Sequence, residues 1–192
     1  MNHSNENEDL SLIREALEGN RDSFGALVDK YKDALFNFVY KLMYNRDDAM
    51  DVCQDTYLKA YTHLKEFKVE YKFSTWLYTI AINTSRNKLK RRKFAFFSID
   101  KPVQNDDEEI TDEPADTAET TEQALLKKEK NELLSEIIRS LSPDYRIPFL
   151  LKHEENRSLE EIAGITGLST GVVKIRIHRA RNILFKKFKE RV

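Results

Sequence analysis

The spacing of apolar residues predicts that the first half of the chain is helical. In the segment that starts at Asp22, apolar residues such as Phe24, Leu27 and Tyr31 recur at intervals of three and four, which gives a helix one apolar face. Asp22 itself fits the N-cap position of this helix. The same periodicity predicts further helices over residues 10–17, 47–64 and 74–97.

The second half of the chain is also predicted to be helical, with one irregular position. Apolar spacing indicates an amphipathic helix over residues 125–141, and Ser142 and Pro143 fit the N-cap and first position of the next helix. Pro148 follows inside that helix, where its ring and missing N–H predict a kink or a later start. Only 5 Gly and 4 Pro occur in 192 residues, so the turn residues of a β-rich protein are scarce and we predict an all-α fold.

A helix-turn-helix is predicted from residue 158 onward. Ser158 and Glu161 fit a capping box, in which the side chain of each residue accepts a hydrogen bond from the backbone N–H of the other residue. Gly167 can adopt the left-handed backbone that ends this short helix, and Ser169 caps the next one. Small Ala163, four residues before the turn glycine, fits the crossing of the two helices.

The second helix of this motif has an apolar side and a basic side. The apolar side consists of Val173, Ile177, Ala180 and Leu184. The candidate DNA-contacting residues are Lys174, Ile175, His178 and Arg179 on the opposite side, with Arg176 and Arg181 flanking the apolar stripe. Cationic side chains on one face can hold phosphates and read guanine edges in a major groove. The alternative is that a basic helix near a C-terminus only complements the helix dipole and keeps the surface solvated.

Charge is distributed unevenly along the chain, although the formal net charge is only −1. Residues 98–122 carry one Lys or Arg against ten Asp or Glu and contain few apolar residues. Such a segment cannot bury enough surface to offset the entropy lost on ordering, so we predict an acidic flexible linker. It separates two small helical domains over residues 1–97 and 123–192, of which the second is clearly basic.

The composition disfavours several classes of protein. Cys53 is the only cysteine, so the chain can form neither an intramolecular disulfide nor a multi-cysteine metal site. The polar N-terminus and the lack of 18 uninterrupted apolar residues predict no signal peptide and no membrane insertion, which makes the cytoplasm the expected location. No Gly-rich phosphate loop, nucleophile pair or ligand cluster stands out, so we expect no catalytic residue, no metal and no cofactor.

Five short strings resemble bacterial sigma factors of the sigma-70 family, in particular the extracytoplasmic-function (ECF) group. RDDAMDVCQDTY at residues 46–57 resembles their polymerase-binding helix, and FSTWLYTIAIN at residues 73–83 resembles their strand-opening segment. LSPDYR, LEEIA and GVVKIRIHRAR, at residues 141–146, 159–163 and 171–181, resemble their region 4. The resemblance implies a region 2 helical bundle in residues 1–97 and a region 4 helix-turn-helix in residues 123–192.

The resemblance also implies a function and a set of partners. An alternative sigma factor binds core RNA polymerase, directs it to specific promoters and helps to melt the DNA, and it is not an enzyme. The implied partners are core polymerase, promoter DNA both as duplex and as melted strand, and an anti-sigma factor. The implied polymerase contacts are Asp48, Asp51, Gln54 and Asp55, for which the alternative is a solvated helix face.

The resemblance assigns two promoter elements to the two domains. Aromatic and basic side chains that stack on bases and follow phosphates suit a melted minus-ten strand. The implied contacts there are Phe67, Lys68, Tyr71, Lys72, Asn83, Arg86, Lys88 and Lys90. The basic face of the last helix, from Lys174 to Arg181, is implied to read the minus-thirty-five duplex. The aromatic residues expected to pack instead are Tyr57, Tyr61, Phe73 and Trp76.

Two other classes of protein explain the sequence less completely. A stand-alone helix-turn-helix transcription regulator would explain the second domain equally well, but it would not explain the two N-terminal strings. A metal nuclease using Asp48, Asp51 and Asp55 is disfavoured, because no accompanying His or Glu cluster is present.

Overall fold

The computed structural model describes residues 2–98 and 133–191, with side chains over residues 6–92 and 133–191. Every regular element in these ranges is a helix, which confirms the all-α prediction. Residues 133–139 are also helical. The predicted linker, beyond Ser98, lies outside the described residues. The elements are α1 (Asn2–Leu17), α2 (Arg21–Met43), α3 (Arg46–Thr62), the 3-10 helix η1 (Leu64–Glu66), α4 (Phe73–Ser98), α6 (Pro143–His153), α7 (Leu159–Thr166) and α8 (Thr170–Lys189).

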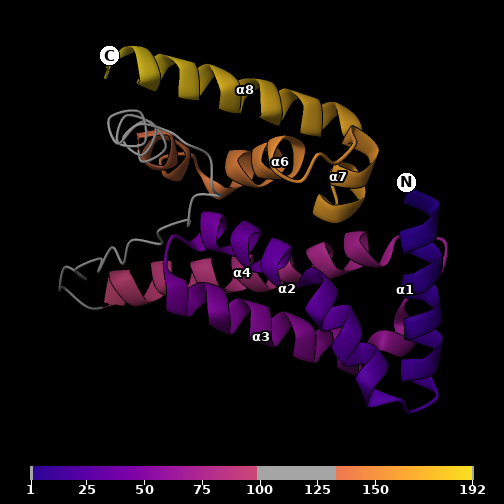
Figure 1. The fold of residues 1–192 in the computed structure, drawn as a ribbon. Helices are drawn as coiled ribbons and strands as arrows, with labels where there is room; N and C mark the ends of the chain where they lie inside the picture. The colour runs from indigo at the N-terminus through magenta and orange to yellow at the C-terminus, as the bar shows by residue number, and fades with distance from the viewer. Residues whose placement is uncertain (1, 99–132, 192) are drawn as a thin grey trace, which may run out of the picture.

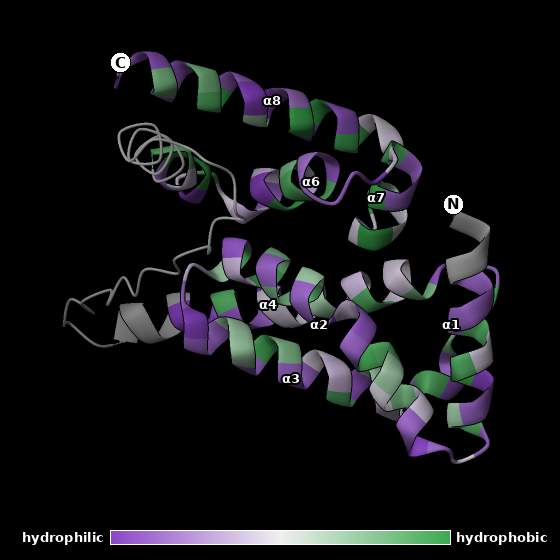
Figure 2. Ribbon diagram, in the orientation of Figure 1, coloured by the Kyte–Doolittle hydropathy of each residue, from purple (hydrophilic) through white to green (hydrophobic). Residues whose placement is uncertain are grey.

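The N-terminal helices form a bundle around one apolar core. α2 packs against α3 and α4, α3 packs against α4, and α1 stands at one end of the bundle against α2 (Figure 1). Hydrophobic and hydrophilic segments alternate along these helices, as the helical periodicity requires (Figure 2). The side chains with the least exposure in this core include Leu35, Phe38, Leu42, Val52, Leu77 and Ile82.

The start of α2 and the extent of α1 differ from the prediction. Asn20 rather than Asp22 is the N-cap of α2, because its side-chain oxygen accepts the backbone N–H of Asp22 at 3.1 Å. α1 begins eight residues earlier than predicted, at Asn2. Its polar half is held by the buried carboxylate of Asp9, which accepts hydrogen bonds from Lys30 Nζ at 2.6 Å and Tyr31 OH at 2.5 Å. Apolar periodicity cannot detect a helix that is held by polar contacts.

The helix-turn-helix prediction is confirmed at each of its local signals. Ser158 Oγ accepts the backbone N–H of Glu161 at 3.1 Å, and Glu161 Oε2 accepts the backbone N–H of Ser158 at 2.9 Å. Gly167 ends α7 in the left-handed conformation with φ 70°. Ser169 is the N-cap of α8, where its side chain accepts the N–H of Val172. These contacts fix the angle between α7 and α8.

The structure explains how Pro148 is accommodated inside α6. The helix starts at Pro143 and continues through Pro148, so the late start allowed for in the prediction is wrong. Because proline has no N–H, the carbonyl of Asp144 loses its usual helical donor. Nη1 of Arg176, from α8, lies 3.3 Å from this carbonyl and 3.0 Å from the Asp144 carboxylate. The Arg176 side chain, from α8, therefore supplies the hydrogen-bond donor that α6 lacks at this carbonyl.

The N-terminal and C-terminal halves pack directly against each other. α4 contacts α7 and α2 contacts α6, and buried apolar residues of both halves belong to one continuous cluster. In Figure 1 the helices of the C-terminal half lie over α2 and α4. Among the described helices, none combines the length and the hydropathy needed to cross a membrane.

Candidate nucleic-acid interface

The α8 helix separates an apolar side from an exposed basic side, as its sequence predicts. Val173, Ile177 and Ala180 are buried against α6 and α7, and Leu184 is half-buried. The predicted DNA-contacting residues on the opposite side, Lys174, Ile175, His178 and Arg179, are all exposed. Ile175 keeps 52% of its surface exposed, so this face offers both an apolar and several polar groups to a ligand.

The two flanking arginines of α8 are held within the C-terminal half. Arg176 is half-buried and forms an ion pair with Asp144 at 3.0 Å. Nε and Nη2 of Arg181 lie 3.3 Å and 3.1 Å from Nε2 of His153 on α6. Burial, followed by the charges of Arg181 and Lys152, lowers the pKa of His153, which favours the neutral ring that can accept these bonds. Arg176 is thus half-buried, whereas Arg181 stays exposed, and both arginines are held by residues of α6.

The two predicted base-stacking residues of the loop before α4, Phe67 and Tyr71, lie in different environments. Phe67 is half-buried and packs edge-on against Phe73 and Trp76, with ring centroids 5.9 Å and 5.5 Å apart. Trp76 and Phe73 therefore pack as expected, and Phe67 joins them. Tyr71 keeps 62% of its surface exposed, and Lys68 is exposed beside it. Of the two predicted base-stacking residues, only Tyr71 presents its ring to solvent.

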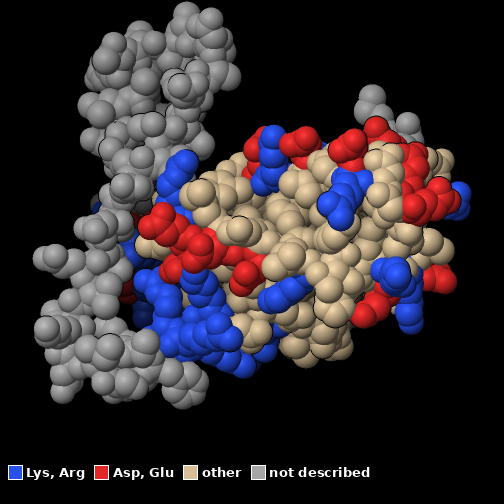
Figure 3. All heavy atoms as spheres, turned by 90° about the horizontal axis from the view of Figure 1, so that it is seen from below, with Lys and Arg blue, Asp and Glu red and all other residues tan. Residues whose placement is uncertain are grey.

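Basic residues of α4 and acidic residues of α3 form ion pairs with each other. Lys88 Nζ lies 2.9 Å from Asp48 and 2.6 Å from Asp51, and Arg92 lies 2.6 Å from Asp48. The side chain of Asp48 is only 19% exposed, which is less than an outward-facing stripe requires. Figure 3 shows this arrangement as a dense group of Lys and Arg side chains next to a row of Asp and Glu side chains.

Most of the other predicted contact residues of α3 and α4 have exposed side chains. Asn83 and Lys90 on α4 are exposed, and Arg86 is half-buried. Gln54 and Asp55 on α3 are exposed. The structure therefore joins Asp48, Asp51 and Lys88 into one ion-pair group, and it leaves Gln54 and Asp55 on the open face of α3.

Two exposed apolar residues of α3 were missed by the sequence reasoning. Met50 and Leu58 keep 54% and 64% of their surface exposed, although α3 has a complete buried side. Together with Gln54 they recur every fourth residue, which places all three on the same outer face of the helix. This spacing on the polar side of an amphipathic helix is the signal that could have identified them.

The Glu161 carboxylate is expected to make the fold sensitive to acid. Burial raises its pKa, but the backbone N–H of Ser158 and the charges of Lys72 and Arg157 outweigh this effect, so the pKa lies below its ordinary value of 4.5. A carboxyl group with a depressed pKa contributes stability that is present above about pH 4.5 and is lost as the pH falls through the depressed pKa.

The test compares the parent chain with Glu161→Gln, which cannot ionise. We expect the difference between their thermal unfolding temperatures to shrink as the pH is lowered from about 6 to about 3. Protonation of other carboxyl groups affects both chains and cancels in the difference. A difference that stays constant over this range would contradict the assignment.

Within the described residues, no group of three or more His, Cys, Asp or Glu side chains is placed to hold a metal ion. Two acidic side chains of α3, Asp48 and Asp51, are instead paired with Lys88 and Arg92 of α4.

Comparisons with known proteins extend over both halves of the chain. Residues 27–95 match the sequence profile of Sigma-70 region 2, and residues 131–184 match that of Sigma-70, region 4. The RNA polymerase sigma-H factor of Pseudomonas aeruginosa is 32% identical over 181 residues, which cover 93% of each protein. The ECF RNA polymerase sigma factor SigW of Bacillus subtilis is 29% identical over 178 residues, covering 93% of this chain and 95% of SigW.

Solved structures with a similar fold cover most of the chain as well. The sigma factor RpoE of Bartonella quintana, in complex with the anti-sigma factor NepR, is 26% identical with a TM-score of 0.68, over 86% of this chain and 96% of RpoE. CnrH in complex with the cytosolic domain of CnrY is 25% identical with a TM-score of 0.67, over 95% of this chain and 98% of CnrH. Since these likenesses include the region 2 bundle and the region 4 helix-turn-helix, the chain belongs to the ECF group of the sigma-70 family of RNA polymerase sigma factors.

Proposed function

We propose that this chain binds core RNA polymerase in the bacterial cytoplasm, directs it to specific promoters and helps to melt the DNA at initiation. The observation that carries the proposal is the similarity to ECF sigma factors over 93% of the chain, which a stand-alone regulator with a similar second domain would not have. The chain itself binds the promoter and positions the polymerase on it, and the polymerase performs the chemistry. No cofactor is part of the proposal.

The C-terminal domain, residues 123–192, is proposed to bind the minus-thirty-five element as duplex. α8 is 20 residues long and exposes Lys174, Ile175, His178 and Arg179 from a turn that is fixed by Gly167. An α-helix fits the major groove, where arginine and lysine pair with guanine edges and with phosphates. Ile175 is suited to an apolar contact with a thymine methyl group.

The N-terminal domain, residues 1–97, is proposed to hold the melted minus-ten strand along the loop before α4 and along α4 itself. Tyr71 offers an exposed ring for stacking, and Lys68 lies close to it in the chain. Asn83 and Lys90 extend the polar and basic surface along α4. Phe67, Lys72, Arg86 and Lys88 are assigned to the same element. A movement that breaks the present contacts of Phe67, Lys72 and Lys88 would expose these three side chains further.

The outer face of α3 is proposed to bind core polymerase. Met50, Gln54 and Leu58 share this face, with Asp55 beside them. Exposed apolar groups next to carboxylates suit a partner helix that carries both apolar and basic side chains. Asp48 and Asp51 lie at the edge of this face, where their pairing with Lys88 fixes their orientation.

The apolar residues of α3 give the first test of this surface. Replacing Met50 and Leu58 by serine should weaken binding to core polymerase about tenfold, because removing apolar contacts from the centre of an interface typically costs more than 1 kcal/mol. Fluorescence anisotropy of the labelled chain, titrated with core enzyme, measures the affinity.

The matched control replaces Leu17, an apolar residue at the end of α1 that is 43% exposed, by serine. This change is expected to leave the affinity within about twofold of the parent value, because Leu17 lies on a different helix. Equal effects of the two variants would remove the outer face of α3 from the proposal.

An anti-sigma factor is proposed as a further partner. The Bartonella quintana relative was solved in complex with an anti-sigma factor, and it matches this chain over both domains. The surfaces described above for polymerase and DNA are the surfaces that such an inhibitor would need to cover.

Run-off transcription tests the proposed function directly. Core polymerase is incubated with a promoter library in the presence and absence of the chain, and the transcripts are sequenced. We expect specific start sites only when the chain is present. Tight binding of the isolated chain to duplex DNA, without initiation by the core enzyme, would favour the stand-alone regulator instead.

A further inference from the structure

A hollow of about 400 Å³ lies between the start of α6 and the first half of α8. Ser142, Asp144 and Tyr145 of α6 form one wall of this hollow, and residues of α8 form the other. Two of the α8 residues, Ile175 and Arg179, also belong to the reading face, by which we mean the exposed side of α8 with Lys174, Ile175, His178 and Arg179. The hollow therefore borders the surface that is proposed to enter the major groove.

The wall of the hollow combines an apolar part and a polar part. The apolar part consists of Val172 and Ile175, which keep 39% and 52% of their surface exposed. The polar part includes the hydroxyl groups of Ser142 and Tyr145 and the guanidinium of Arg176. Such a wall suits a ligand in which apolar carbon is joined to anionic oxygen, as deoxyribose is joined to phosphate in a DNA strand.

The two hydroxyl groups in the wall are available to such a ligand. Ser142 is the N-cap residue of α6, but its side chain makes no capping hydrogen bond. Tyr145 is half-buried, and its hydroxyl has no hydrogen-bond partner among the described residues. Because the two residues are three positions apart at the start of a helix, their side chains leave the same side of its first turn. Both hydroxyls can therefore donate to one acceptor group in the hollow.

Among the described residues that line the hollow, Asp144 is the acidic one, and an arginine neutralises it. Nη1 of Arg176 lies 3.0 Å from the Asp144 carboxylate and 3.3 Å from the Asp144 carbonyl. A guanidinium carries five N–H donors, so this pairing leaves donors of Arg176 for a further acceptor. Arg179 adds a second positive charge to the wall. The arginines thus outweigh the carboxylate, and the hollow attracts an anionic group.

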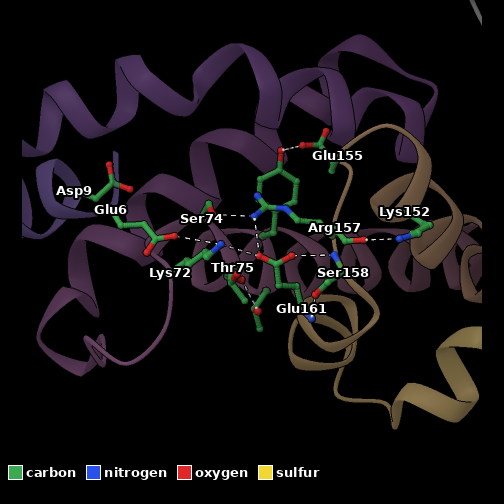
Figure 4. Close-up of polar contacts among 12 residues, drawn as sticks. Glu6, Asp9, Lys72, Ser74, Thr75, Lys152, Glu155, Arg157, Ser158 and Glu161 are labelled. Carbon is green, nitrogen blue, oxygen red and sulfur yellow. Dashed lines mark hydrogen bonds and ion pairs between the residues drawn. The ribbon is translucent and has the colours of Figure 1, made fainter. Parts of the chain in front are cut away.

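At the other end of α6, the basic side chains are already engaged within the C-terminal half. Nε and Nη2 of Arg181 lie 3.3 Å and 3.1 Å from Nε2 of His153. The ammonium group of Lys152 donates to the carbonyl of Arg157 at 3.3 Å, as Figure 4 shows. The two ends of α6 therefore differ, and the end that forms the hollow is the one with unbound hydroxyl donors beside α8.

The dimensions of duplex DNA place one of its strands at this hollow. An α-helix with its side chains is about 10–12 Å across, and the major groove is about 12 Å wide. A helix in the groove therefore fills it, and the sugar–phosphate strands at the two edges of the groove lie against the flanks of the helix. Val172, Arg176 and Arg179 recur at intervals of four and three residues, so they form one flank of α8. This flank is the α8 wall of the hollow.

We infer that the hollow binds one deoxyribose–phosphate unit of the strand beside the reading face, and that this contact sets how far α8 enters the groove. The inference rests on the proposed function and adds the start of α6 to the surface that contacts the minus-thirty-five duplex. The hydroxyls of Ser142 and Tyr145 donate to the phosphate next to Arg176, and Val172 lies against the sugar. Such a contact carries no sequence information, so its loss weakens all minus-thirty-five sequences alike.

Neutral phosphate substitutions test the contact in the complex with core polymerase. The full-length chain is bound to core enzyme and titrated with promoter duplexes that carry a single methylphosphonate at each phosphate of the minus-thirty-five element in turn. The variant Ser142→Ala/Tyr145→Phe is expected to bind the unmodified duplex about tenfold more weakly than the parent, whatever the minus-thirty-five sequence. At one or two neighbouring phosphates of one strand, the substitution should weaken the parent and no longer weaken the variant, because the variant has already lost that contact.

The matched control is Ser11→Ala/Tyr40→Phe, which removes the hydroxyls of an exposed serine and a half-buried tyrosine from α1 and α2. It should keep the affinity within about twofold of the parent and the same sensitivity at every phosphate. A Ser142→Ala/Tyr145→Phe variant with the complete phosphate profile of the parent would overturn the inference. A loss confined to one minus-thirty-five sequence would do the same, because it would indicate base reading.

The dependence of binding on salt gives a second readout. Arg176→Gln removes a charge beside the phosphate, so the slope of log affinity against log salt concentration should fall by about one in magnitude. The hydroxyl variant removes no charge and should keep the slope of the parent. An unchanged slope for Arg176→Gln would contradict the placement of the phosphate. If the parent chain does not bind core polymerase, the proposed function fails, and the same phosphate scan with the isolated chain still decides whether the hollow binds the DNA strand.

Discussion

Replacing Arg146 by alanine is expected to lower the free energy of unfolding by about 3–5 kcal/mol and the unfolding temperature by about 10 °C. Arg146 is 8% exposed and donates to the carbonyls of Leu42 at 2.8 Å, Leu141 at 2.7 Å and Arg139. Its guanidinium also lies 5.1 Å from the centroid of the Tyr44 ring. Alanine would take the Arg146 donor from two buried carbonyl groups and one partly buried carbonyl group, and each buried loss costs about 1–3 kcal/mol.

Backbone carbonyl groups, rather than a carboxylate, stabilise the positive charge of Arg146. In the part of the chain that the structure describes, no carboxylate forms an ion pair with it, and burial lowers its pKa. The carbonyls that it binds belong to the C-terminal end of α2, to the last residue of helix 133–139 and to the turn after it, where the partial charge of a helix is negative. One side chain thereby satisfies the ends of two helices from different halves of the chain.

Thermal unfolding followed by circular dichroism measures the effect, with Arg146→Lys as the comparison. Lysine keeps the positive charge, but its single ammonium group cannot reach three carbonyls with the planar geometry of a guanidinium. We therefore expect Arg146→Lys to recover less than half of the loss. An unfolding temperature of the alanine variant within about 2 °C of the parent would show that the carbonyls find other donors.

The features that could be predicted from sequence depend on residues a few positions apart. The capping box joins residues three apart, and the turn at Gly167 depends on the freedom of one glycine. The buried stripe of α8 follows from helical geometry alone. The same holds for the exposure of Lys174 and Arg179, which lie opposite that stripe. Local rules decide these positions whatever the rest of the chain does.

The features that could not be predicted depend on contacts between distant residues. Asp48 follows the outward spacing of its helix, yet it is shielded because Arg92, 44 residues away, folds over it. Arg157 and Ser74 are separated by 83 residues, and no periodicity relates them. Phe67 lies in a polar segment of sequence, and it is half-buried because Phe73 and Trp76 offer it an aromatic surface. Such partners become known only when the packing of the helices is known.

Replacing Arg179 by alanine is expected to reduce use of the preferred minus-thirty-five sequence about 5-fold to 150-fold, which corresponds to about 1–3 kcal/mol for one bidentate base contact. Arg179 is exposed on the reading face of α8, and no ion pair holds it within the described residues. Transcription from promoters that differ only in the minus-thirty-five element measures the change. The loss should be largest for the preferred sequence, since a phosphate contact would weaken all sequences alike.

Arg176 provides the matched control, because it lies on the same helix one turn earlier and has the same side chain. Its guanidinium is half-buried and bound to the carboxylate and the carbonyl of Asp144, so we expect Arg176→Ala to lower the unfolding temperature by a few degrees. Its discrimination between minus-thirty-five variants should remain close to that of the parent. If Arg176→Ala relaxes discrimination and Arg179→Ala does not, the side of α8 that reads the DNA includes Arg176 and not Arg179. Arg176 must then leave Asp144 when the helix binds DNA.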